Sequence, residues 1–479
     1  MARQQSRTYI ATNSQPGDPQ VADEAGGNAV PIQGRKARYA SRVLATLVLV
    51  ALVAAGCGSS DDDDDAGSTT TSASSTFVPM TGVPGVTDTE IRFALEGTST
   101  TDNPLGECYM ECFADGAKAY FAYRNSQGGI YGRTLVLQDG INDEFGKPQE
   151  AALEVISKND AVGVFSIGVL SVAWAEFVKA QWPVYTYLTD PAAGMHDNIF
   201  SGFGVTTFDH PETAHAYAAL ALHATKVAAV GYAFPSAESC VDQYKLEFDG
   251  IYKKLGVSIV YTNKTLPFGL ANGVGPEVTA MKKAGVDLVF TCLEAGGMKK
   301  FAEEMQRQGL EAPLFTTAQL EPDFVARNAS LFEDAVQAVH VRPSIAADSP
   351  GSKAFYEWMK KSGAEIHNTT YWGWVGADVA FKGLQKAGAP FDRKKLIDAT
   401  NTLTAYSADG MVGAFDIGRS HQGATATNPR AGDVPHCFSF TQIKSGKLTF
   451  MPPETKDKPF LCWPGTTYEY SEPTATDFK

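Results

Sequence analysis

One stretch, from Phe113 to Gln138, constrains the fold most because it predicts a helix, a tight turn and a strand in succession. The side chains that share one helical face in its first half are Ala117, Tyr120, Phe121 and Arg124. Gly128 and Gly129 then follow a polar run, and glycine readily takes the left-handed conformation that ends a helix. Thr134–Leu137 has the character of a buried strand. The stretch therefore predicts one unit of an α/β fold.

Strand and helix patterns alternate along most of the remaining chain. The first block includes a strand at 89–95, a helix at 148–158 and a fully apolar strand at 161–167. A second block has a strand at 226–232 and a helix at 240–255, and later helices are followed by a strand at 411–418. This alternation predicts βαβ units and doubly wound parallel sheets.

Length and charge limit the function classes. A chain of 479 residues is long enough for two domains, and 44% hydrophobic with 20% charged residues is ordinary for a globular protein. The formal net charge is −14, and no basic cluster occurs beyond the N-terminal region. Because phosphate neutralisation needs a basic face, nucleic-acid binding is not expected.

The N-terminal region predicts export and lipid attachment. Four basic residues at 35–42 precede an apolar run at 43–55, which is short for a membrane span. The run ends in Val53-Ala54-Ala55-Gly56-Cys57, which resembles a bacterial lipobox and implies lipidation of Cys57. A secretory signal with an incidental cysteine is the alternative. We expect a leader at 1–56 and a disordered Asp/Ser/Thr tether at 57–85.

Six further cysteines in an exported chain suggest disulfides. Fifteen pairings are possible, and we favour Cys108–Cys112, Cys240–Cys292 and Cys437–Cys462. The middle pair is favoured because both residues follow predicted strands. No metal site is expected, because the cysteines lack CxxC spacing and have no histidines at zinc-ligand spacing.

The turn Asn125…Gly128-Gly129-Ile130…Gly132-Arg133 resembles a motif of the solute-binding proteins of branched-chain amino acid ABC transporters. Phe415-Asp416 with Gly418, after a long helix ending at Gly388, is also similar to that family. The resemblance implies a type I periplasmic-binding-protein fold: two Rossmann-like lobes joined by three crossings. It places lobe 1 at 86–205 and 338–405, and lobe 2 at 206–337 and 406–479.

In open α/β sheets, ligands bind at the carboxyl ends of the strands, so the following loops supply the candidate site. Ser171 opens a predicted helix and, by resemblance, is a candidate for holding a ligand carboxylate. The other candidate ligand residues are Glu96, Thr98, Thr186, Thr189, Tyr232, Phe234, Glu294, Gln319 and Trp372. Aromatic pocket candidates also include Tyr185 and Tyr187.

The loop Thr316–Gln319 departs from the family because it has no carboxylate before Glu321 to pair with a ligand ammonium. Glu294 is an alternative counter-charge, and an amino acid, an amide, an aromatic acid and a short organic acid all stay open. We expect a membrane-anchored monomer on the extracytoplasmic face, which binds a small molecule, needs no cofactor and serves an ABC permease. A lipid-anchored sensory receptor is the alternative. A secreted hydrolase is less favoured, because no nucleophile or metalloprotease motif is present.

Overall fold

The computed structural model describes residues 77–479 apart from 171, 205–207, 209, 424, 426, 428, 430–431, 433–435 and 464. The predicted leader, Cys57, most of the predicted tether and Ser171 lie outside the described residues. Among the helices that are described, none has the length and apolar character needed to span a bilayer.

Within the described chain, the first lobe contains a parallel sheet with the strand order β2-β1-β3-β4-β5. Its strands are β1 (Glu90–Gly97), β2 (Thr134–Asn142), β3 (Val164–Ile167), β4 (Val184–Tyr185) and β5 (Ile199–Phe200). Its helices are α1 (Met110–Ser126), α2 (Pro148–Lys158), α3 (Trp174–Lys179), α4 (Pro191–Gly194), α10 (Pro350–Ser362), α11 (Asn368–Ala387) and α12 (Arg393–Thr400). Neighbouring residues of β1, Phe93 and Ala94, belong to separate apolar clusters, so the sheet is covered on both faces.

The second lobe has the parallel order β10-β9-β8-β6-β7, extended past β10 by antiparallel strands. The parallel strands are β6 (Lys226–Tyr232), β7 (Ser258–Leu266), β8 (Leu288–Cys292), β9 (Leu314–Thr316) and β10 (Val336–Val339). The antiparallel strands are β11 (Cys437–Lys444), β12 (Lys447–Phe450), β13 (Phe460–Cys462) and β14 (Thr474–Thr476). The helices are α5 (Thr213–Ala221), α6 (Pro235–Leu246), α7 (Gly275–Ala284), α8 (Ala295–Gln308) and α9 (Pro322–Arg327). These two sheets have the doubly wound α/β architecture expected from the alternation.

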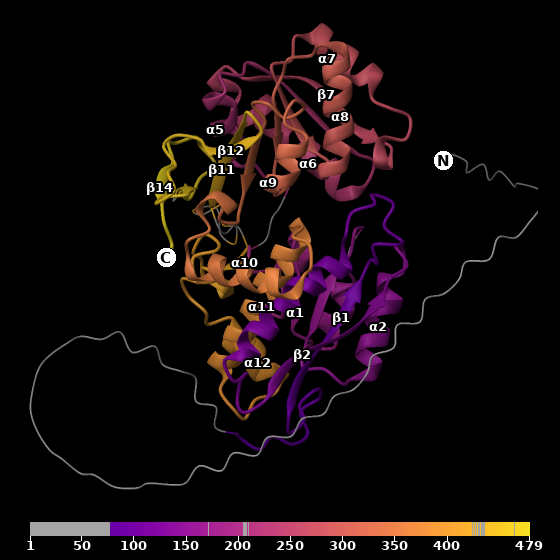
Figure 1. Ribbon diagram of the computed structural model, residues 1–479, viewed down its shortest axis with the longest axis vertical. Helices are drawn as coiled ribbons and strands as arrows, with labels where there is room; N and C mark the ends of the chain where they lie inside the picture. Colours follow the sequence, from indigo (N-terminus) through magenta and orange to yellow (C-terminus); the bar gives the residue numbers. More distant parts are fainter. Residues whose placement is uncertain are drawn as a thin grey trace, which may run out of the picture. The chain divides into compact units, whose positions relative to one another are not determined.

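After β10 the chain returns to the first lobe, where α10 and α11 pack against α1 and α12 packs against α11 (Figure 1). The expected border at 405 differs from the packing seen in the structure. Tyr406, Val412 and Phe415 are buried in the apolar cluster of the first lobe. The described residues from Tyr406 into the short 3-10 helix η5 (Ile417–His421) therefore pack with the first lobe.

Two predicted elements have different forms in the structure. The strand expected at 411–418 is wrong: the segment makes isolated bridges through Val412 and Phe415 and ends in η5. The helix expected at 240–255 begins earlier, as α6, and continues as a π-helical turn at Glu247–Ile251. Non-helical backbone angles at Gly250 interrupt it there.

Residues 77–85 are expected to belong to a disordered tether, but in the structure Phe77 and Val78 pack against the Gly132-Arg133 turn. Arg133 is buried, and its guanidinium donates hydrogen bonds to the carbonyl oxygens of Thr87, Val78 and Tyr131. It also lies 4.5 Å from the centre of the Phe77 ring. Arg133, the arginine of the sequence motif, thus holds the segment from Phe77 to Thr87 against the first lobe.

Helices α1 and α11 approach so closely that two glycines are needed at their contact. A methyl group on Gly373 would lie 1.8 Å from the carbonyl oxygen of Phe113, and one on Gly116 would lie 2.0 Å from that of Thr370. Real atoms do not come this close. The two helix backbones therefore pack directly against each other.

We expect Gly373→Ala to destabilise the protein by about 2–4 kcal/mol, because the added methyl group must push the helices apart. Gly376→Ala is the matched control, one turn further along α11, where a methyl group would make ordinary contact 3.6 Å from the Phe165 ring. That control should be neutral or slightly stabilising, since alanine favours a helix. Urea unfolding would measure both, and equal effects would contradict the role of this contact.

Candidate functional site

A cavity of about 840 Å³ is lined by loops of both lobes, a volume in the range of small-molecule pockets. The first lobe contributes the loop before α1, the loop after β4 and the start of α11. The second lobe contributes the loops that follow β6, β8 and β9. The loops after parallel strands thus meet at the cavity, as the topology predicts.

Six of the predicted ligand residues line this cavity: Thr189, Tyr232, Phe234, Glu294, Gln319 and Trp372. Their contact with a ligand stays a prediction. Of the two further aromatic candidates, Tyr187 lines the cavity, whereas Tyr185 is fully buried in the core of the first lobe.

Three other predicted residues, Glu96, Thr98 and Thr186, are absent from the described lining and are buried in the first lobe. Glu96 lies within β1 instead of in the loop after it, and accepts a hydrogen bond from Ser166 on β3. Burial raises the pKa of Glu96 to about 8. The Thr98 hydroxyl donates to Asp143 Oδ2 at 2.8 Å and accepts from the Val169 N–H. These bonds hold the strand ends of the lobe together.

An aromatic wall covers the first-lobe side of the cavity. The rings of Tyr187 and Trp372 stack with centroids 3.9 Å apart and an interplanar angle of 6°. Tyr109 meets Trp372 edge-on at 6.4 Å. This wall offers a flat apolar surface with a π-face, suited to a planar ligand group.

On the second-lobe side, Glu294 caps α8 and faces the cavity. Its Oε1 accepts hydrogen bonds from the Gly297 N–H at 2.7 Å and from the Tyr232 hydroxyl at 3.0 Å. Its Oε2 is buried without a hydrogen-bond partner among the described residues. Burial raises the pKa of Glu294, and the nearby carboxylate of Glu107 adds to the rise.

Gln319 offers a second polar group with unused capacity. The residue is only 6% exposed and lines the cavity. Neither its Oε1 nor its Nε2 has a hydrogen-bond partner within the described chain. Because burying an amide without a partner is costly, this side chain indicates a ligand or water contact.

A hydrogen bond that no sequence pattern predicted joins the two lobes beside the cavity. Glu321, at the start of α9, accepts a hydrogen bond at 2.9 Å from the Tyr371 hydroxyl of α11. The Tyr371 hydroxyl also lies 2.8 Å from that of Tyr356 in α10. Burial, and to a lesser degree the charge of Asp323, raise the pKa of Glu321 to about 7.

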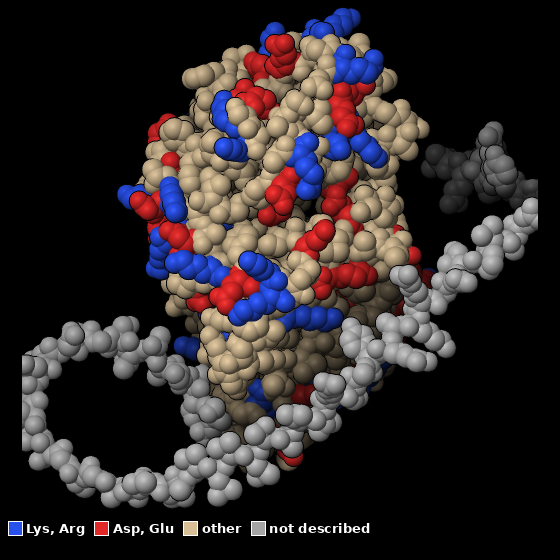
Figure 2. All heavy atoms as spheres, viewed as in Figure 1, with Lys and Arg blue, Asp and Glu red and all other residues tan. Residues whose placement is uncertain are grey.

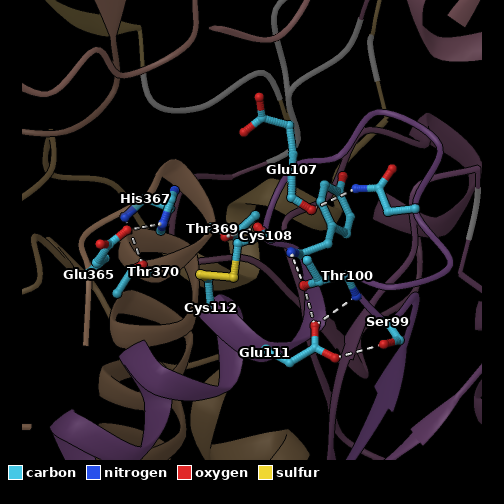
Figure 3. The surroundings of a disulfide bond; sticks show 12 residues. Ser99, Thr100, Glu107, Cys108, Glu111, Cys112, Glu365, His367, Thr369 and Thr370 are labelled. Carbon is cyan, nitrogen blue, oxygen red and sulfur yellow. Dashed lines mark hydrogen bonds and ion pairs between the residues drawn. A yellow bond between two sulfur atoms is a disulfide. The ribbon is translucent and has the colours of Figure 1, made fainter. Parts of the chain in front are cut away.

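The Cys108–Cys112 disulfide joins the cavity loop to the first turn of α1 (Figure 3). Glu111 accepts hydrogen bonds from Ser99 and Thr100, which holds the loop after β1 against the helix. His367 lies near both sulfurs, but a metal would need thiolates and these sulfurs are bonded to each other.

The other pairs are Cys240–Cys292, which joins α6 to β8 beside the cavity, and Cys437–Cys462, which joins β11 to β13. The structure thus contains the three pairs favoured from the sequence. Two of them stiffen opposite walls of the cavity.

The chain belongs to the periplasmic binding protein family, whose model matches residues 99–447. Its fold is the type I fold of these proteins. The family is one of binding proteins, so the chain has a solute-binding role and not an enzymatic one. A comparison with curated protein sequences found no match.

Similar solved structures agree on the fold. A branched-chain amino acid ABC transporter protein from Thermus thermophilus with bound valine is 15% identical, with a TM-score of 0.58 over 81% of this chain and 97% of the other. A solute-binding protein from R. palustris in complex with 4-hydroxybenzoate is 20% identical, with a TM-score of 0.58 over 75% and 95%. A fatty acid ABC transporter substrate-binding protein from Thermomonospora curvata is 18% identical, with a TM-score of 0.60 over 77% and 94%.

The raised pKa of Glu321 predicts a pH-dependent stability. Since burial raises this pKa from 4.5 to about 7, the folded state binds the proton more tightly than the unfolded state does. The stability that the bound proton supplies is fully present below about pH 4.5 and is lost as the pH rises from there through 7. Glu321→Gln keeps an acceptor for Tyr371 without the charge. We expect the variant to be more stable than the original protein by less than about 1 kcal/mol at pH 5, and by about 1–2 kcal/mol more than that at pH 8.

Urea unfolding at both pH values would measure this difference. Glu311→Gln, at an exposed carboxylate of the same lobe, is the control and should show no change with pH. A stability difference for Glu321→Gln that is the same at pH 5 and pH 8 would contradict the assignment.

Proposed function

We propose that the protein is an extracytoplasmic solute-binding lipoprotein that captures a small polar molecule between its lobes for uptake by an ABC transporter. The observation that carries this proposal is the cavity of about 840 Å³ lined by both lobes. A ligand that contacts both walls stabilises the arrangement in which the walls are close, so binding favours closure of the lobes.

The cavity supports a ligand that combines a flat or apolar part with hydrogen-bonding groups. Trp372 and Tyr187 provide the flat surface, and Gln319 and Glu294 provide polar atoms without partners in the described chain. Similar structures contain valine and 4-hydroxybenzoate, so amino acids, amides and aromatic or organic acids form the first panel to test.

We expect Trp372→Ala to weaken binding of any hit from this panel by about tenfold or more, because the stacking surface is lost. A thermal-shift screen of the leader-free protein, refolded to remove carried ligand, would identify hits. Ligand at 100 times its dissociation constant should add about 2.7 kcal/mol of stability.

Trp358→Ala is the matched control, because Trp358 packs on Tyr123 and is not part of the described lining. It should leave the dissociation constant unchanged. If no compound of the panel shifts the melting temperature, the solute-binding proposal loses its support.

Attachment to the extracytoplasmic face of the membrane through Cys57 is part of the proposal and rests on the lipobox-like sequence. Cys57→Ser removes the sulfur that would carry the lipid. We expect the native chain in the membrane fraction of a bacterial host and the variant in the soluble exported fraction. Metabolic labelling with a fatty acid should mark only the native chain, and equal labelling of both would contradict the anchor.

A further inference from the structure

Two carboxyl groups from opposite lobes meet at the cavity. Glu107 belongs to the first-lobe loop before α1, and Glu294 caps α8 in the second lobe. A methyl group on Gly296, in the first turn of α8, would lie 3.5 Å from Glu107 Oε1 and 3.6 Å from Glu294 Oε1. The two carboxyl groups therefore flank the same glycine.

The loop that carries Glu107 is held against the second lobe. Leu105 packs on the apolar cluster of that lobe, and the Cys108–Cys112 disulfide ties the next residue to α1. In Figure 3 the Glu107 side chain extends away from the disulfide, whereas Glu111 turns back toward Ser99 and Thr100. The position of Glu107 beside Gly296 is thus supported from both sides.

No lysine or arginine makes an ion pair with Glu107 or Glu294 among the residues that the structure describes. Burial raises the pKa of Glu107, and the Gly296 N–H and the charge of His367 only partly offset this. Among the other titratable lining residues, Glu321 is half-buried and bonded to Tyr371, and His367 is half-buried. Asp323, Arg327 and Glu365 are exposed. Acidic and basic side chains are interspersed on the outer face shown in Figure 2. The half-buried charge of the cavity, by contrast, is mainly negative.

Two independent observations support the assignment of the acidic pair to a ligand site. Gln319 lines the same cavity with both amide atoms buried and unpartnered in the described chain. The stacked rings of Trp372 and Tyr187 present an aromatic face, which attracts cations as well as planar groups.

We propose that the cavity selects an organic cation with a planar or apolar part, and that Glu107 and Glu294 close on its positive charge from opposite lobes. This inference rests on the proposed solute-binding function and names its ligand class. Without a cation the two carboxylates repel each other across the cleft. A bound amine, amidine or guanidine group turns this repulsion into attraction to both lobes, and so drives closure.

The test uses matched triplets of a cation, a neutral amide and an acid on one framework, such as benzamidine, benzamide and benzoate. Phenyl, indole and alkyl frameworks would each supply one triplet. The refolded protein is screened by thermal shift and each hit is measured by calorimetry. We expect the cation of at least one triplet to bind about tenfold or more tightly than its amide, and the acid to bind weakest.

Glu107→Gln and Glu294→Gln should each weaken binding of that cation by about tenfold or more, because each removes one half-buried charge. Glu311→Gln is the control at an exposed carboxylate outside the described lining, where solvent screens the charge, and should change affinity by less than about twofold. The melting temperature of each variant without ligand shows that it is folded.

Tighter binding of amides or acids than of their cations, with both glutamine variants unchanged, would overturn this inference and leave the solute-binding function standing. Absence of binding by every member of every triplet and by the first panel would contradict both. If Glu107→Gln binds the cation as tightly as the original protein does, the proposal that Glu107 and Glu294 close together on its charge is overturned.

Discussion

The direct contact between the backbones of α1 and α11 is the constraint on which the binding site depends. Gly116 and Gly373 leave no room for side chains between these helices. The start of α11 carries Trp372, and the Thr369 hydroxyl donates a hydrogen bond at 3.0 Å to the carbonyl oxygen of Cys108 just before α1. Segments far apart in the sequence are thereby brought together into one cavity wall, although the chain crosses to the second lobe between them.

Much of the fold follows from local patterns. The parallel strands are short apolar runs flanked by helices, and β6 has the bounds that the sequence predicts. The turn with Gly132 and Arg133 also has a clear physical role, because the arginine is buried among three carbonyl oxygens. The loops after β6, β8 and β9 could be assigned to the site because the carboxyl ends of parallel strands lie at one edge of a sheet.

The remaining features depend on contacts that a local pattern does not encode. Glu96 is a charged residue that follows an apolar run, which is typical of a loop. In the structure, β1 extends past that run and buries Glu96 beside Ser166. Residues near Val412 form no strand, because their apolar side chains fill the first lobe and pair only through isolated bridges. Glu107 lies in an irregular loop, and its place beside Gly296 arises only when the two lobes meet.

Two contacts of opposite character span the cleft. Glu321 accepts a hydrogen bond from Tyr371, which favours the ionised carboxyl, whereas burial favours the protonated one. Glu107 and Glu294 repel each other when both are ionised, and burial strengthens that repulsion. The Glu321–Tyr371 hydrogen bond forms without a ligand, whereas a cation is needed to relieve the repulsion between Glu107 and Glu294. Part of the free energy that closes the lobes must therefore come from the ligand. A binding protein requires this balance, because lobes that closed fully by themselves would exclude the solute.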